Sequence, residues 1–181
     1  MLARIGQMRS NYLLQNHEAT LASVVKVLGT DKIPPEIIRE ANFYQAKSFL
    51  ALEQLDKALE SFRKVAVEVS SKEGAESKFR IAEIYMRKNL DKRAEEEVFS
   101  FVNMNTPHQF WMASAFILLA DIYSRAGDDF QAQHTLQSIL DNYDLVNDGI
   151  IETAQRKLND LRRKQTLLGA PKPVEQLEIK F

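Results

Sequence analysis

The chain has 181 residues, of which 27% are charged and 45% hydrophobic, so it is long enough to bury a substantial core. Its net charge of −1 provides no electrostatic attraction to nucleic acid or to an anionic membrane, and the absence of cysteine excludes disulfides, thiolate metal sites and cysteine nucleophiles. No stretch approaches the roughly 18–20 consecutive apolar residues of a membrane span, and we expect no membrane insertion by this chain.

The first expected helix lies at the N-terminus, where apolar residues recur at steps of three or four, at Leu2, Ile5, Met8 and Tyr12. No capping residue precedes this pattern. We therefore expect the natural protein to continue before Met1. A localisation signal would then belong to the missing part, and a periplasmic or cell-envelope location is expected only if a larger parent chain carries one.

Apolar periodicity and turn signals then alternate and predict helix pairs. The pairs are expected over about 2–29, 34–70, 72–105 and 107–143, followed by a capping helix over 148–165 and an extended or flexible tail over 166–181. Within the second pair, the second helix is expected over Leu55–Val69. Ser70 and Glu73 have the spacing of a capping box.

Two further helix starts are marked by caps. Thr106 is expected to accept a hydrogen bond from the Gln109 amide, with Pro107 at the first helical position. The carboxylates of Asp128 and Asp129 lie in a turn, where an acidic residue favours the start of the next helix, so we interpret them as a cap.

A small residue and an aromatic recur three residues apart, and another alanine follows twelve after the first. The three copies, spaced by 36 and 38 residues, are Ala46/Phe49/Ala58, Ala82/Tyr85/Ala94 and Ala120/Tyr123/Ala132. Antiparallel helices approach closely only where the contacting side chains are small, so we expect each alanine pair at the contact within one helix pair. The first pair departs from the pattern, because Arg9 stands where the small residue belongs.

This pattern resembles the tetratricopeptide repeat, whose unit is about 34 residues. Phe62, Val98 and Leu136 match the later large apolar position of the family in part, whereas its early tryptophan is missing. The resemblance implies an all-α fold, a right-handed α-α superhelix (solenoid) of about four helix pairs plus a C-terminal capping helix. The long connectors resemble those of bacterial envelope members, so we expect the C-terminal repeats of a larger bacterial envelope protein.

The resemblance implies protein binding without catalysis, because the first helices of stacked pairs line a concave groove. We expect a non-catalytic scaffold that holds a peptide or a partner surface in that groove. Carried over position by position, the groove residues are Glu40, Phe43, Lys47, Leu50, Glu76, Phe79, Glu83, Met86, Arg87, Ile117, Asp121, Ser124 and Arg125.

Two kinds of groove ligand are compared. A clamp for a terminal carboxylate is disfavoured, because Glu83 and Asp121 interrupt the available cations, which are Lys47, Arg80, Arg87 and Arg125. A partner helix or extended segment fits better, contacting the apolar residues Phe43, Phe79, Met86 and Ile117. Burial of these four in the core between repeats is the open alternative.

Nothing in the sequence predicts an enzyme, a metal site or a cofactor. His17, His108 and His134 have no carboxylate or second histidine at helical ligand spacing, and no serine lies on a strand-turn-helix elbow. Trp111 is expected to pack in the interior, although an exposed Trp111 would be a binding hot spot.

Two alternatives to groove binding remain open. One is a structural assembly module, which stacks on other repeats or on a second copy and forms a homo-oligomer. The other is a nucleic-acid binder that uses the basic final helix, with Arg156, Lys157, Arg162, Arg163 and Lys164. No aromatic residues interleave these cations, so a polar end-cap is favoured and no nucleic acid is expected.

Overall fold

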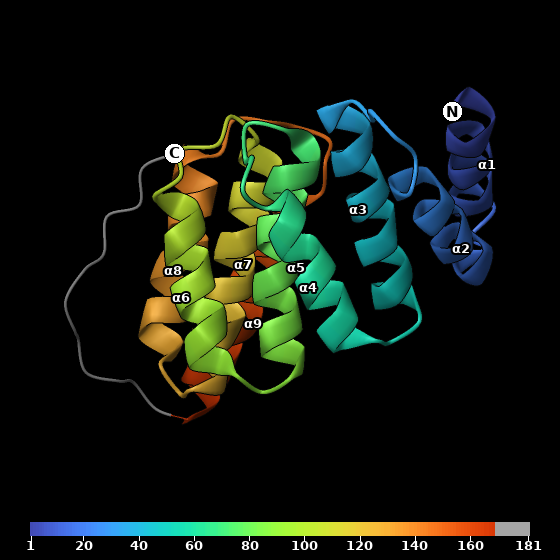
Figure 1. Ribbon diagram of the computed structural model, residues 1–181. Helices are drawn as coiled ribbons and strands as arrows, with labels where there is room; N and C mark the ends of the chain where they lie inside the picture. Colours follow the sequence, from blue (N-terminus) through green and yellow to red (C-terminus); the bar gives the residue numbers. More distant parts are fainter. Residues whose placement is uncertain (169–181) are drawn as a thin grey trace. The chain divides into compact units, whose positions relative to one another are not determined.

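The computed structural model describes residues 1–168, and all regular secondary structure in this part of the chain is helical (Figure 1). The helices are α1 (Leu2–Leu13), α2 (His17–Leu28), α3 (Pro35–Ala51), α4 (Leu55–Val65), α5 (Lys72–Arg87), α6 (Asp91–Val102), α7 (Gln109–Arg125), α8 (Asp129–Asn142) and α9 (Ile150–Leu168). The predicted all-α repeat fold is confirmed. Residues 166–168 of the predicted tail belong to α9, and 169–181 lie outside the described residues. None of these helices has the length and apolar character of a membrane span.

The chain divides into two compact units, Met1–Ile84 and Tyr85–Phe181. In the first unit each of α1 to α4 packs against the next, and α1 also contacts α3. In the second unit each of α6 to α9 packs against the next, and α7 also contacts α9. Contacts between a helix and both its neighbour and its second neighbour are typical of stacked helix hairpins.

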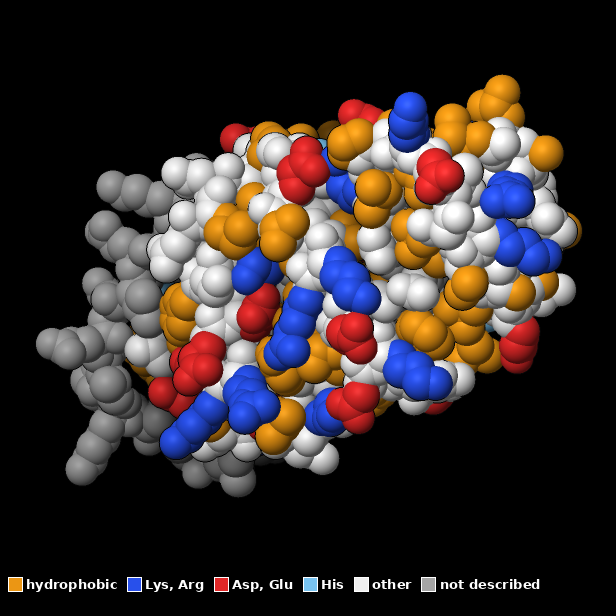
Figure 2. Space-filling view, viewed as in Figure 1, with side chains coloured by type: hydrophobic (Ala, Val, Ile, Leu, Met, Phe, Trp, Pro, Cys, Tyr) orange, Lys and Arg blue, Asp and Glu red, His pale blue; other side chains and the backbone are white. Residues whose placement is uncertain are grey.

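Charged side chains of both signs cover the face of the molecule seen in Figure 2. Lysine and arginine lie among aspartate and glutamate, with hydrophobic side chains between them. This mixture agrees with the near-zero net charge and gives that face no extended patch of one sign.

The recurring alanines of the sequence are buried. Their exposed fractions are 0% to 2%, for Ala46, Ala58, Ala82, Ala94, Ala120 and Ala132. Ala46 and Ala58 come from α3 and α4, and Ala120 and Ala132 come from α7 and α8, two pairs of helices that pack together. Buried residues of this size are what a close approach of two helix backbones requires.

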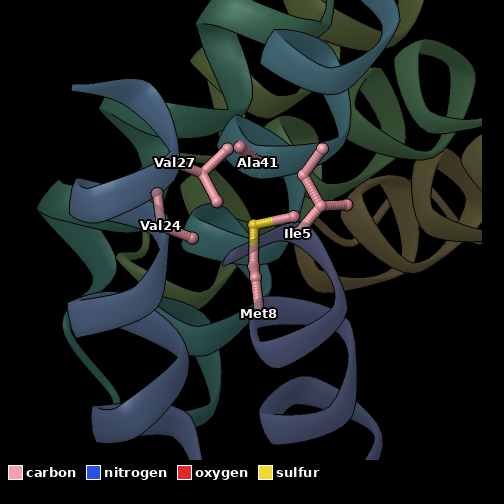
Figure 3. Packing of buried hydrophobic residues seen from close by; sticks show 5 residues of the cluster. All are labelled: Ile5, Met8, Val24, Val27 and Ala41. Carbon is pink, nitrogen blue, oxygen red and sulfur yellow. The ribbon is translucent and has the colours of Figure 1, made fainter. Parts of the chain in front are cut away.

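One buried hydrophobic cluster of the first unit lies where α1, α2 and α3 meet. Figure 3 shows its side chains pointing toward one another; they are Ile5, Met8, Val24, Val27 and Ala41. Leu2, which the sequence assigns to an apolar helix face, is instead 81% exposed, and Val25 of α2 is 66% exposed. The periodicity is too permissive at these positions, because α1 and α2 bury only the sides that they turn toward each other and toward α3.

The connection between α4 and α5 corrects two predictions. Helix α4 ends at Val65, four residues before the predicted end at Val69. The chain then turns, and the Ser71 hydroxyl donates to the Glu68 carbonyl oxygen at 2.7 Å. The same hydroxyl oxygen accepts from the Gly74 amide at 3.1 Å, so Ser71 caps α5 where Ser70 was expected to do so.

The start of α7 also differs from its predicted capping box. The Thr106 hydroxyl oxygen accepts from the His108 amide at 3.2 Å, and the helix begins only at Gln109. Pro107 therefore lies in the preceding turn, because a hydrogen bond over two residues closes a turn ahead of the helix. The predicted cap of α8 is confirmed: Asp128 Oδ1 accepts from the Gln131 amide at 3.0 Å.

Two helical glycines are expected to respond to alanine with opposite signs. A Cβ at Gly74 would overlap the Glu68 carbonyl oxygen and lie 2.5 Å from its carbonyl carbon, whereas a Cβ at Gly6 meets nothing within 4 Å. Gly74→Ala should lower the free energy of unfolding by more than about 1 kcal/mol. Gly6→Ala should raise it by about 0.5–1 kcal/mol through helix propensity. Urea denaturation followed by circular dichroism measures both, and equal effects would contradict the close approach at Gly74.

Candidate functional site

A cleft of about 490 Å³ lies in the first unit, lined by residues of α1, α3 and the first turns of α5. These are the first helices of successive pairs, the helices from which the sequence predicted a groove. Its lining residues are Arg9, Tyr12, Glu36, Ile37, Arg39, Glu40, Phe43, Tyr44, Lys47, Lys72, Glu73 and Glu76. Four residues predicted for the groove are among them, namely Glu40, Phe43, Lys47 and Glu76.

Aromatic rings form one wall of the cleft. The rings of Tyr12 and Tyr44 are stacked, with centroids 4.1 Å apart and planes inclined by 14°. Phe43 lies 6.4 Å from Tyr44 and meets the fully buried Phe62 edge-on at 6.3 Å. Phe43 is only 9% exposed, so it supports the wall from the core while the two tyrosines remain half-buried at its surface.

Arg9 and Glu40 form a bidentate ion pair across α1 and α3. Both nitrogen–oxygen distances, from Nε to Oε1 and from Nη2 to Oε2, are 2.7 Å. The hydrogen bonds from Arg9 hold the pKa of Glu40 below its ordinary value against the opposing effect of burial. The Tyr44 hydroxyl also donates to Glu40, and burial together with this carboxylate raises the pKa of Tyr44 to about 12.

Removing Arg9 is expected to change the acid response of the first unit. The pKa of Glu40 is lower in the folded chain, so the ion pair stabilises the fold above the ordinary pKa of 4.5 and loses this effect as the pH falls through the folded value. In Arg9→Gln the pKa of Glu40 should rise toward its ordinary value, so the part of the acid-induced loss of stability that comes from Glu40 should become smaller. Carboxyl chemical shifts in an NMR titration measure the pKa directly. An unchanged Glu40 titration would show that Arg9 does not set it.

A second ion-pair cluster connects α3 with α5. Lys47 Nζ lies 2.6 Å from Glu76 Oε1, and the side chain of Glu76 is only 9% exposed. Arg80 reaches the same oxygen at 3.4 Å and Glu83 Oε2 at 2.8 Å. The Lys47 ammonium also lies 5.7 Å from the centre of the Phe43 ring. Both cations are therefore occupied by carboxylates of this chain, which leaves neither of them open as a clamp for a partner's carboxylate.

The remaining cleft charges lie toward the N-terminal ends of α3 and α5. Arg39 Nη1 pairs with Glu68 Oε2 at 2.6 Å, and its Nε lies 3.8 Å from Glu73 Oε2. Glu36 and Lys72 are exposed, and neither forms an ion pair with another described residue. Four basic and four acidic residues line the cleft, so its formal charge is zero.

Three other predicted groove residues of the first unit do not line the cleft. Leu50, Phe79 and Glu83 are half-buried, and the Arg80 guanidinium lies 5.2 Å from the centre of the Phe79 ring. Glu83 forms the ion pair with Arg80 described above. Phe79 and Glu83 thus make contacts within the unit.

The predicted groove residues of the second unit are Met86, Arg87, Ile117, Asp121, Ser124 and Arg125. Asp121 and Ser124 line a smaller cleft of about 270 Å³ formed by α7, α8 and α9. Asp121 is paired there with Lys157 at 2.6 Å. Arg125 is bound by the second unit itself, donating to Asn89 Oδ1 at 2.7 Å. Met86 and Ile117 are half-buried and Arg87 is exposed.

The sequence analysis did not predict most of the residues that line the cleft, although one pattern in the sequence indicates them. The apolar periodicity identifies Tyr12 only as a residue on a helix face. The repeat pattern identifies Arg9 only as a departure from the small residue expected at that position. A basic residue is nevertheless followed by its acidic partner about 30 positions later, in Arg9 with Glu40, Arg39 with Glu68 and Lys47 with Glu76. The interval is close to the length of one repeat. The pairs Arg9–Glu40 and Lys47–Glu76 therefore connect successive helix pairs, whereas Glu68 lies in the connection that follows α4.

The described residues contain no group of three or more histidine, aspartate or glutamate side chains that could hold a metal ion. Trp111 is half-buried, intermediate between an interior and an exposed position, and its ring meets Phe110 edge-on at 4.9 Å. The cleft is thus lined by stacked rings and by paired ions.

Comparisons with known proteins support the helical repeat fold. The tetratricopeptide repeat family model matches residues 40–69 and 111–144, which lie in the α3–α4 and α7–α8 pairs. No curated protein matches the sequence. The crystal structure of BtubC (BKLC) from P. vanneervenii is similar over 97% of this chain and 81% of that chain, with a TM-score of 0.56 and 17% identity. At this identity the likeness shows the fold alone. The chain therefore contains tetratricopeptide repeats, which the family model matches on two of its helix pairs.

Proposed function

We propose that this chain is a protein-interaction module that holds a segment of a partner protein in the cleft lined by α1, α3 and α5. Tetratricopeptide repeats generally mediate interactions between proteins. The observation that carries the proposal for this cleft is the stacked pair of Tyr12 and Tyr44 at its surface. Tyrosine and arginine are enriched at the centres of protein interfaces, where rigid rings provide contact area at low entropic cost.

The module acts by binding and without catalysis. Its charged groups near the rings are engaged with each other, as in Arg9 with Glu40 and Lys47 with Glu76. A catalytic site needs a titratable group directed at a reacting atom, together with an activating neighbour. The ion pairs instead stabilise the positions of α1, α3 and α5 around the cleft.

A single labelled cysteine tests where a ligand binds, because the sequence contains no cysteine of its own. Peptides are first selected from a random displayed library on the complete chain. An environment-sensitive dye is then attached in Lys72→Cys at the cleft, and in Lys26→Cys, whose side chain is exposed on α2 away from the cleft lining. We expect a selected peptide to shift the emission of the dye at position 72 and to leave that at position 26 unchanged.

Comparison of the two labelled variants distinguishes binding in the cleft from a change elsewhere in the chain. A shift at both positions would indicate a global change instead of binding in the cleft. Selected peptides that bind the chain but leave the dye at position 72 unaffected would refute the cleft as the site. Circular dichroism of both labelled variants checks that the fold is retained.

A second candidate function is self-association through the exposed side of α1 and α2. Large hydrophobic residues are unusually exposed there, with Leu2, Leu13, Leu14 and Val25 at 66% to 81%. Exposed apolar surface of this kind marks interaction sites. Sedimentation equilibrium should show an average mass that rises with concentration, and Leu13→Gln together with Leu14→Gln should abolish the rise. The same exchange at the equally exposed Val67 serves as the control.

A further inference from the structure

We propose that the partner segment is uncharged where it enters the α1–α3–α5 cleft and that it places an aromatic or large aliphatic side chain against Tyr12 and Tyr44. This inference rests on the proposed function and names the chemistry of the partner. It follows from which groups of the cleft are already satisfied and which are open.

The charged groups of the cleft are largely satisfied within the chain. Glu40 receives two hydrogen bonds from Arg9 at 2.7 Å, and Glu76 receives Lys47 at 2.6 Å. A charged partner side chain directed at Glu40 or Glu76 would have to replace one of these contacts, gaining one ion pair for each one lost. Such an exchange contributes little net affinity, because the desolvation of the incoming charge opposes it.

The two exposed charges at the rim do not change this balance. Glu36 lies in the first turn of α3 and Lys72 begins α5, and their charges have opposite sign. Since the whole lining is formally neutral, long-range attraction favours neither an acidic nor a basic segment.

The aromatic wall is the part of the cleft where contact with a partner contributes most to binding. Tyr12 and Tyr44 are only half-buried, so covering their rings removes apolar surface from water. Within the described part of the chain the Tyr12 hydroxyl has no hydrogen-bond partner, whereas the Tyr44 hydroxyl donates to Glu40. The Tyr12 hydroxyl is therefore open to a backbone group of the segment, and the rings are open to its side chain.

The size of the cleft agrees with a short segment. A volume of about 490 Å³ lies within the range of pockets that enclose a small ligand. It admits a few side chains of a linear segment and not a folded domain.

The salt dependence of binding tests the charge of the segment on the unaltered chain. The affinities of the selected peptides are measured by fluorescence anisotropy at about 0.1 M and about 1 M NaCl, where the Debye length falls from about 10 Å to about 3 Å. We expect the dissociation constant to change by less than about threefold, and the shared sequence of the peptides to contain aromatic or aliphatic positions without a conserved charge. A conserved charge, or a weakening of about tenfold or more at high salt, would overturn the inference.

Substitutions then test the anchor. Tyr12→Ala and Tyr44→Ala should each weaken binding by about tenfold or more, whereas Glu36→Gln and Lys72→Met should change it by less than about twofold. Tyr44→Phe keeps the ring and removes only its bond to Glu40, so it should bind nearly as the unaltered chain does. Loss of affinity in the charge variants with retention in the alanine variants would reverse the assignment.

The two proposals fail in different ways. If selected peptides shift the dye at position 72 but carry a conserved charge, the interaction function stands and the inference on partner chemistry is wrong. If no selected peptide affects that dye, both are wrong. Because the salt titration uses the chain without substitution, a variant that fails to fold does not remove the test.

Discussion

Phe62→Ala is expected to lower the free energy of unfolding by about 3–5 kcal/mol, the cost typical of truncating a buried phenylalanine. Phe62 is fully buried on α4 and meets the Phe43 ring edge-on at 6.3 Å. The substitution removes the apolar contact and leaves a cavity that the packed hairpin fills only in part. Urea denaturation followed by circular dichroism measures the loss.

Truncation of an exposed residue tests whether burial is the cause of this loss of stability. Val67 follows α4 closely and is 77% exposed, so Val67→Ala should change the free energy of unfolding by less than about 0.5 kcal/mol. Because Phe62 supports Phe43, the Phe62→Ala variant should also weaken peptide binding in the cleft under conditions where it remains folded. Equal effects of the two substitutions would contradict the core position of Phe62.

Glu76→Gln is expected to lower the free energy of unfolding by about 1.5–3 kcal/mol, the range for hydrogen bonds to charged groups. The substitution keeps the size of the side chain and removes the charge that faces Lys47 at 2.6 Å and Arg80 at 3.4 Å. The Glu76 side chain is 9% exposed, so water does not replace the lost interaction well. The same denaturation measurement applies.

The exposed pair of Glu60 and Lys64 provides the control. Their charged atoms are 3.0 Å apart, but the side chains are 72% and 51% exposed. Glu60→Gln makes the same chemical change in water, where an ion pair contributes little, and should lower the free energy of unfolding by less than about 0.5 kcal/mol. A loss at Glu76 no larger than that at Glu60 would show that the cleft ion pairs do not stabilise the unit.

The sequence is most informative where one physical requirement excludes the alternatives. Only a small residue allows two helices to approach closely, so the recurring alanines are expected to be buried on that ground alone, and all six are exposed by 2% or less. The cap at Asp128 follows for a similar reason, because a carboxylate at the start of a helix satisfies a free amide. The caps expected at Ser70 and Thr106 are wrong, since neighbouring hydroxyls and amides offer an equally short bond.

The residues that line the cleft can be predicted only in part from the sequence. Family positions lead to Glu40, Phe43, Lys47 and Glu76, which line the cleft, but equally to Phe79, which lies outside it. A position in a repeat determines which helix face carries a residue. It does not determine whether the neighbouring helix leaves that face open, and this depends on ion pairs between residues about 30 positions apart.

By itself, the sequence determined the helical repeat architecture and the burial of its recurring alanines, because helix periodicity and the size of a residue are local properties. Only the tertiary structure decided which charges neutralise one another and which rings remain open. Along the chain Arg9 is a defect in the repeat and Tyr12 an ordinary apolar residue, whereas in the fold Arg9 binds Glu40 and Tyr12 stacks on Tyr44. These properties arise from packing between helices distant in the chain, and a pattern along one helix does not contain them.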